Sequence, residues 1–206
     1  MRRHLVVLAK RPLPGYAKTR LGAAIGAEQA AGVYARLLYA YLLDLLSAPP
    51  PGTRMELSVA APADVSFFAD AFPELLVRPQ VEGTLGQRLA ASFARAFAEG
   101  AETVVVTSSD VPGLSSQIVC AAFEALESRP VVIGPSSDGG YYLIGMRAPG
   151  APLFDRVEWS SERVLAQTEA LAQTVGLALT YLPEQDDVDT GGDFERWRLR
   201  VRTISD

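Results

Sequence analysis

Residues 5–21 read LVVLAKRPLPGYAKTRL, and this stretch joins a predicted strand to a cationic loop. Val6, Val7 and Leu8 form a short continuous apolar run, which is typical of a strand covered on both faces. The prolines and the glycine that follow predict an extended turn that continues neither as a strand nor as a helix. Four cations belong to this stretch: Lys10, Arg11, Lys18 and Arg20.

Cations on a stiff loop that follows a strand suit an anionic ligand. In open α/β sheets, ligands bind outside the carboxyl ends of the strands, so we expect a phosphate site here. The alternative interpretation is a solvated basic loop. A P-loop is disfavoured, because GYAKT at residues 15–19 lacks the adjacent Gly-Lys with which backbone amides wrap a phosphate.

Composition and charge narrow the class of protein. The 206 residues are 49% hydrophobic and 21% charged, which suffices for a substantial core, and the even spread of apolar residues favours one domain over residues 1–206. A net charge of −5 disfavours a nucleic-acid partner. The N-terminal apolar run ends at Lys10 without a cleavage signal, so we expect a cytoplasmic protein without a signal peptide, a transmembrane span or a membrane partner.

Cys120 is the only cysteine and His4 is the only histidine. A single cysteine excludes an intrachain disulfide and a thiolate metal cluster, and a single histidine excludes triads and zinc sites that depend on histidine. A metal ion used by this chain must then be a hard cation held by carboxylates, most naturally Mg²⁺ or Mn²⁺.

Strands and helices alternate along the chain, which predicts an α/β fold: a three-layer α/β/α sandwich around a mostly parallel mixed sheet. Apolar residues repeat every four positions from Val33, which predicts a helix over 27–47. The TVVV run within 102–107 predicts the central strand. Further strands are expected at 55–60, 75–78, 131–134, 141–146 and 177–182, and further helices over 63–72, from 84, over 115–126 and up to about 174.

The segment GTLGQRL at 83–89 opens a helix. Thr84 and Gln87 have the spacing of a capping box. A helix N-terminus next to Gly86 can receive an anion, and Arg88 lies in the first turn. The alternative is an ordinary capped helix whose arginine is solvated.

Two aspartates follow predicted strands. Asp110, in SSDVPG, comes directly after the central strand and beside the same crevice as the first loop; the alternative is a turn-forming aspartate before Pro-Gly. Asp138 belongs to Asp-Gly-Gly between two apolar runs, which predicts a hairpin turn and an antiparallel strand after it. A functional role for Asp138 stays open beside the turn.

Near the chain end, DDVDTGGDF at 186–194 places three aspartates within four residues. Their charges are costly to bring together unless solvent or a cation separates them. Alternatively, Asp189 caps the last helix, or Thr190 and Asp193 form a capping box there.

Taken in order, these motifs resemble the nucleotide-diphospho-sugar transferase superfamily with the GT-A fold. Within it, the chain is most similar to uncharacterised bacterial glycosyltransferase-like transferases that begin AKxPxPGxxKTRL. The resemblance extends over nearly the whole chain, from AKRPLPGYAKTRL through GTLGQRL, SSDVPGL and GPSSDGGYYLIG to DVDTGGDF.

The resemblance implies a set of site residues. Lys18 and Arg20 would meet the nucleotide phosphates, and Asp110 with Asp189 would hold Mg²⁺ or Mn²⁺. The catalytic set would be Lys18, Arg20 and Asp110, with further nucleotide or phosphate contacts from Ala9, Lys10, Gly15, Gly86 and Arg88. The acceptor would meet the 136–160 region, through Asp138, Gly139, Gly140, Tyr142 and Trp159. Tyr141, Tyr142 and Trp159 could stack on a ring, but we expect at least two of them to be core residues.

The implied activity is Mg²⁺-dependent transfer from a nucleotide, in the form of nucleotidyl transfer from a nucleoside triphosphate to a small phosphorylated or hydroxyl acceptor. The single carboxylate of Ser108-Ser109-Asp110 favours this form, because glycosyltransferases of this fold usually carry Asp-x-Asp there. Gly191-Gly192 also replaces the Pro-Glu of many relatives. The alternatives are a glycosyltransferase with a nucleotide-sugar donor and a nucleotide-binding module without turnover, and a homodimer stays open.

Overall fold

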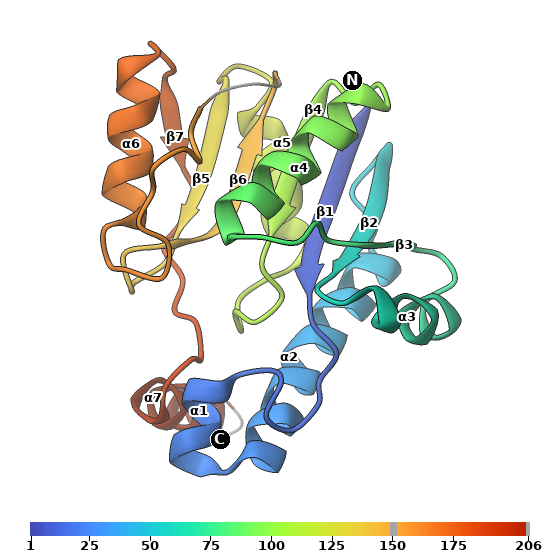
Figure 1. The fold of residues 1–206 in the computed structure, drawn as a ribbon, viewed down its shortest axis with the longest axis vertical. Coiled ribbons are helices and arrows are strands. Elements are labelled where there is room, and N and C mark those ends of the chain that lie inside the picture. Colours follow the sequence, from blue (N-terminus) through green and yellow to red (C-terminus); the bar gives the residue numbers. More distant parts are fainter. Residues whose placement is uncertain (149–151, 205–206) are drawn as a thin grey trace.

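The computed structural model describes residues 1–148 and 152–204, which form a seven-stranded sheet with helices on both faces (Figure 1). The strands are β1 (Arg3–Ala9), β2 (Thr53–Val59), β3 (Leu76–Pro79), β4 (Thr103–Thr107), β5 (Val131–Pro135), β6 (Tyr141–Met146) and β7 (Leu179–Tyr181). The helices are α1 (Thr19–Ile25), α2 (Ala27–Ser47), the 3-10 turn η1 (Pro62–Asp64), α3 (Val65–Ala71), α4 (Leu85–Ala98), α5 (Ser116–Ala125), α6 (Val164–Thr174) and α7 (Gly191–Ile204).

The sheet runs in the order β3-β2-β1-β4-β6-β5-β7. Strand β6 is antiparallel to both of its neighbours, β4 and β5, whereas the other pairs are parallel. The predicted mostly parallel mixed sheet, its central TVVV strand and the antiparallel hairpin strand are therefore confirmed. Because the chain leaves β1 toward β2 and later returns to β1's other side with β4, the β1–β4 boundary is a topological switch point, where open α/β sheets bind ligands.

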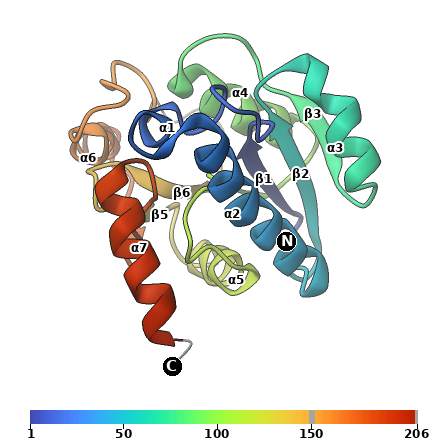
Figure 2. The same cartoon turned by 90° about the horizontal axis from the view of Figure 1, so that it is seen from below.

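Alternation along β1 divides the core into two layers. Leu5 and Val7 point into a cluster that α2, α3 and α5 complete, while Val6 points to the opposite cluster under α4 and α6. Figure 2, which looks along the sheet from below, shows these helices on its two sides. This arrangement explains the uninterrupted apolar run of β1, since both faces of the strand are covered.

A third cluster lies at the carboxyl edge of the sheet, where α1 and α7 pack together below β1 (Figure 1). It joins Leu21 of α1, Val33 and Leu37 of α2, and Val188 and Phe194 near the chain end. These contacts bring the end of the chain to the first loop.

Helix α1 corrects one prediction. The extended turn was expected to exclude a helix, but it ends at Lys18, and Thr19–Ile25 is helical. The prolines and Gly15 lie before the helix, and Leu21 is fully buried in the third cluster. Burial of this side chain stabilises a seven-residue helix that would be marginal in isolation.

One buried carboxylate joins the strands to α4. Glu56 on β2 is almost fully buried and pairs with Arg95 of α4, while His4 Nε2 lies 3.4 Å and Arg78 Nη1 3.9 Å from its other oxygen.

The Glu56→Ala variant should lose about 3–5 kcal/mol of unfolding free energy, because cationic groups would then lack a buried partner. Urea unfolding measures this, with Glu99→Ala as the control: Glu99 pairs with Arg78 and Arg54 near the surface, and its loss should cost about 0–1 kcal/mol. Equal losses in the two variants would contradict the argument.

Within residues 1–148 and 152–204, the helices are all too short or too polar to traverse a bilayer.

Candidate functional site

A cavity of about 510 Å³ opens at the carboxyl ends of the strands, at the β1–β4 switch point. Its lining includes the cationic loop, the end of β4, the start of α4, the start of β6 and the segment before α7. A second hollow of about 470 Å³ lies between α2 and α7, but it is mainly apolar, and its charged lining residues are Arg36 and Arg198. Among the described residues, cationic and anionic side chains together line only the first of these two cavities.

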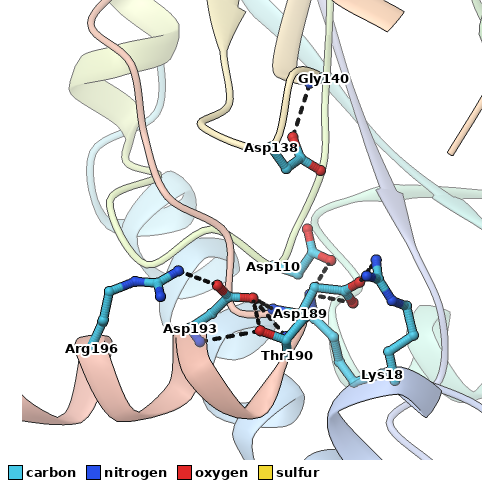
Figure 3. Close-up of polar contacts among 9 residues, drawn as sticks. Lys18, Asp110, Asp138, Gly140, Asp189, Thr190, Asp193 and Arg196 are labelled. Carbon is cyan, nitrogen blue, oxygen red and sulfur yellow. Dashed lines mark hydrogen bonds and ion pairs between the residues drawn. The ribbon is translucent and has the colours of Figure 1, made fainter. Parts of the chain in front are cut away.

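At the centre of this cavity, one lysine forms ion pairs with two aspartates from distant parts of the sequence. Lys18 Nζ lies 2.7 Å from Asp110 Oδ2 and 3.6 Å from Asp189 Oδ1 (Figure 3). The Lys18 side chain is only 4% exposed, whereas the two carboxylates are 32% and 28% exposed. An ammonium group therefore lies between two carboxylates that are open to the cavity.

Arg20 approaches one of these carboxylates, that of Asp189, from outside. Its Nη1 donates to Asp189 Oδ2 at 2.9 Å, and the side chain is 72% exposed. The structure thus brings together four residues that the sequence nominated, namely Lys18, Arg20, Asp110 and Asp189.

Asp187 adds a further carboxylate to the lining of the cavity. Burial raises the pKa of Asp187 to about 6, against the opposing effect of Lys18 and with a contribution from Asp138, Asp110 and Asp189. Burial lowers the pKa of Lys18, but Asp110 and its neighbouring carboxylates outweigh burial, so that the pKa lies above its ordinary value. The described lining of the cavity thus combines three carboxylates, those of Asp110, Asp187 and Asp189, with four cationic side chains, those of Lys10, Lys18, Arg20 and Arg88.

Local backbone geometry fixes Lys18. The residue precedes α1 in the left-handed region, with φ 52° and ψ 48°, and its carbonyl accepts from Gly22 N. Such a conformation costs a non-glycine residue about 1–3 kcal/mol. In this conformation the Lys18 side chain points toward the two carboxylates, and its ion pairs with them help to offset the strain.

Asp189 is positioned by the capping box that follows it. Thr190 N donates to Asp193 Oδ2 at 2.7 Å, and Asp193 N donates to Thr190 Oγ1 at 3.3 Å (Figure 3). Thr190 is therefore the N-cap of α7, and of the two interpretations left open the capping box is the observed one. The Asp189 side chain is left to face Lys18 and Arg20.

The Asp-Gly-Gly segment forms the hairpin turn. Asp138 Oδ1 accepts from Gly140 N at 2.9 Å, and Figure 3 shows Asp138 apart from the Asp110–Asp189 group. Gly139 has φ +84°, and a Cβ there would lie 2.1 Å from the Glu162 carbonyl oxygen. The turn itself accounts for the first two residues of this motif.

The aromatic residues of the expected acceptor region are all packed. Tyr142 is buried and donates to the Pro183 carbonyl at 3.0 Å, although it also lines the cavity. Trp159 lies edge-on to Tyr141 and covers Gly86, where a Cβ would lie 2.5 Å from Trp159 Nε1. Gly86, which was expected to contact the nucleotide, is thus buried against Trp159 and the Phe154 carbonyl. Residues 149–151 of the 136–160 region lie outside the described residues.

The remaining loop residues divide between the cavity and its surroundings. Ala9, Lys10 and Arg88 line the cavity, and Arg88 is held by hydrogen bonds to Gly83 O and Gln80 Oε1, each 3.1 Å long. Gly15 has φ +74° in the exposed turn. Arg11 leaves the site, because its guanidinium lies 4.2 Å from the centroid of the Phe67 ring.

Several cavity residues were missed from the sequence: Tyr16, Tyr34, Gln80, Ser109 and Ser160. Tyr16 could have been found, since it lies within the cationic loop between Gly15 and Lys18. The others had no signal beyond their position in a predicted element or turn. Ser160, like Lys18, has a positive φ, at 66°.

The carboxylates match the ligands that Mg²⁺ and Mn²⁺ prefer, and the Lys18 ammonium already occupies a cation position between them. In the described part of the chain, no group of three or more His, Cys, Asp or Glu side chains has the arrangement of a complete metal site. Mg²⁺ is usually bound through one or two carboxylates, substrate phosphates and water. Asp110 and Asp189 fit such a cation if a nucleotide supplies the other ligands.

Comparison with known proteins identifies a family for this chain. Residues 48–161 match the family described as "Uncharacterized protein conserved in bacteria (DUF2064)"; this range contains Asp110 and Asp138, whereas Lys18 and Asp189 lie outside it. No curated protein sequence matches the chain.

Solved structures match nearly the whole chain. A Desulfovibrio desulfuricans G20 protein, provisionally assigned as a nucleotide-diphospho-sugar transferase, is 30% identical with a TM-score of 0.83, over 92% of this chain and 83% of that one. A Methanothermobacter nucleotidyl transferase is 19% identical with a TM-score of 0.62, over 98% and 99% of the two chains. Rv0371c from Mycobacterium tuberculosis H37Rv, in complex with manganese, is 16% identical with a TM-score of 0.53, over 95% and 97%. The last two similarities show the fold.

Proposed function

The chain belongs to the DUF2064 family, within the nucleotide-diphospho-sugar transferase superfamily, and we propose that it is a metal-dependent transferase that holds a nucleotide at the β1–β4 switch point. The observation that carries the proposal is the meeting of Lys18, Asp110 and Asp189 in one cavity, although they come from distant parts of the chain. Residues 1–206 would act as one domain.

Each end of the cavity would bind a different part of the reactants. The phosphates would lie against Lys10, Lys18 and Arg20, with Arg88 on the side toward β3. Asp110 and Asp189 would hold Mg²⁺ or Mn²⁺, which supplies charge neutralisation at the reacting phosphate when bound. The acceptor would enter beside β6, where Tyr141 and Tyr142 line the cavity.

The favoured reaction is nucleotidyl transfer. An acceptor oxygen attacks the α-phosphorus of a nucleoside triphosphate, the bond from this phosphorus to the bridging oxygen of the β-phosphate breaks, and pyrophosphate leaves. A hydroxyl acceptor loses its proton to water. Lys18 and Arg20 would stabilise the charge that grows on the phosphates, and transfer at phosphorus needs little beyond such positioning and neutralisation.

Glycosyl transfer from a nucleotide-sugar is the second candidate. The relative at 30% identity, provisionally assigned as a nucleotide-diphospho-sugar transferase, favours it. The single aspartate at the end of β4, preceded by Ser108 and Ser109, favours nucleotidyl transfer.

Product analysis separates these reactions. We expect pyrophosphate to be released when the protein is incubated with Mg²⁺, each nucleoside triphosphate in turn and a panel of phosphorylated and hydroxyl acceptors. Release of a nucleoside diphosphate from a nucleotide-sugar would indicate glycosyl transfer instead. Calorimetry completes the test: nucleotide binding that is unaffected by Mg²⁺ and by Asp110→Asn, without turnover, would identify a binding module and reject the transferase.

A further inference from the structure

The pairing of the two strands that flank the site, β1 and β4, stops before β1 ends. Parallel pairing of β1 with β4 ends at Val7 and Thr107. Beyond that point the Ser109 hydroxyl donates to the Leu8 carbonyl at 2.8 Å, in the place where a backbone ladder would have continued. A side-chain hydrogen bond therefore joins β1 to the segment after β4 at the edge of the cavity.

Tyr34 of α2 extends this link to the cationic loop. Its hydroxyl lies 3.0 Å from Ser109 Oγ and accepts from Lys10 N at 2.9 Å. Tyr34 and Ser109 are both buried, with only 4% of each residue exposed. Lys10 begins the cationic loop, and Ser109 precedes Asp110.

The donor and the acceptor can be assigned for each of these hydrogen bonds, because a carbonyl oxygen can only accept. The single Ser109 proton is donated to the Leu8 carbonyl, so the Tyr34 hydroxyl donates to Ser109 and accepts from Lys10. Burial raises the pKa of Tyr34 to about 12, which keeps the phenol protonated for this role. The hydroxyls of Tyr34 and Ser109 each donate one hydrogen bond and accept one, so neither is left unsatisfied.

We propose that Tyr34 is a positioning residue, which fixes the cationic loop relative to Asp110 through Lys10 N and Ser109. This inference rests on the proposed function, because it concerns the spacing between the groups that would bind phosphate and the carboxylate that would bind metal. Tyr34 would act through Lys10 and Asp110 rather than on the reactants.

The same helix supplies a matched control. Tyr41 is also a buried tyrosine of α2, and its hydroxyl lies 3.1 Å from Thr107 Oγ1 on β4. This bond joins α2 to the sheet as the Tyr34 bond does, but neither end belongs to the cationic loop or to the residue before Asp110.

The test compares Tyr34→Phe with Tyr41→Phe, each of which removes one hydroxyl. Both should lower the Tm by about 2–4 °C, because each loses one buried hydrogen-bonding group. Binding of Mn²⁺ with inorganic tripolyphosphate, which carries the phosphates of a nucleotide without its base, is measured from the electron paramagnetic resonance of free Mn²⁺. We expect Tyr34→Phe to weaken this binding about 10–100-fold, as loss of a group that orients metal ligands does, and Tyr41→Phe to leave it unchanged.

Ser109→Ala breaks the next bond of the same chain. It should weaken binding by a similar factor, and the Tyr34→Phe/Ser109→Ala double variant should weaken it little further, because residues of one hydrogen-bond network are not additive. Equal binding by Tyr34→Phe and Tyr41→Phe would overturn the positioning role while leaving the proposed function standing. Failure of the unaltered protein to bind Mn²⁺ with tripolyphosphate would instead remove the proposed function, and the positioning role with it.

Discussion

The Asp110→Asn variant is expected to lose about three to four powers of ten in turnover, since the metal that Asp110 would hold contributes several kcal/mol of charge stabilisation. Asparagine keeps the shape of the side chain but removes its charge. Asp110 is 32% exposed, and Asp189 remains 3.6 Å from Lys18. We therefore expect the fold to persist, and steady-state pyrophosphate release with a thermal melt of the same sample measures both effects.

Asp70→Asn is the control for this loss of charge. Asp70 is an exposed carboxylate of α3, so its replacement should change neither turnover nor Tm. A collapse of the Tm in Asp110→Asn would show that Asp110 holds the fold together. Turnover retained at the level of Asp70→Asn would remove Asp110 from the metal site.

Lys18→Met should have opposite effects on two measurements. Methionine removes the ammonium from between Asp110 and Asp189, and Mn²⁺ should then bind these carboxylates more tightly in the absence of nucleotide. Turnover should fall about 10²–10³-fold, as expected when one group that stabilises transition-state charge is lost. Titration of Mn²⁺ followed by electron paramagnetic resonance gives the first quantity, and pyrophosphate release gives the second.

A change of sign distinguishes this role from a structural one, because a damaged site would lose metal affinity together with turnover. Arg196→Met is the matched control, since Arg196 is an exposed cation that pairs with Asp193 near the same chain segment. It should alter neither quantity. Mn²⁺ affinity lowered in Lys18→Met would refute the view that the ammonium occupies a cation position.

Much of the fold could be predicted because periodicity and burial agree in it. Helix α2 has the predicted bounds, 27–47, and β6 the predicted bounds, 141–146. Both are decided by their own apolar patterns. Helix α1 was missed because its seven residues are too few to show a helical repeat of apolar positions, and the contact that stabilises it, Leu21 against Val188 and Phe194, spans most of the chain.

The candidate site could also be predicted in part from the sequence. Asp110 follows a strand that its sequence identifies, so its place at the sheet edge could be predicted. For Asp189 the sequence left open whether it caps the last helix, and the Thr190–Asp193 capping box excluded that interpretation only once the backbone was known. Nothing in the local sequence indicates that Lys18 is buried or that Tyr34 reaches Ser109, because both depend on contacts with residues far away in the sequence.

The pairing of Arg20 with Asp189 joins residues 169 positions apart. Contacts of such long sequence separation form late, because the entropy of closing the intervening loop must be met before the contact contributes. During synthesis the sheet from β1 to β6 can therefore assemble while the pocket is still open on one side. The Asp189 carboxylate can join Lys18 and Asp110 only after residue 189 has left the ribosome, and we expect a fragment that stops short of it to lack turnover.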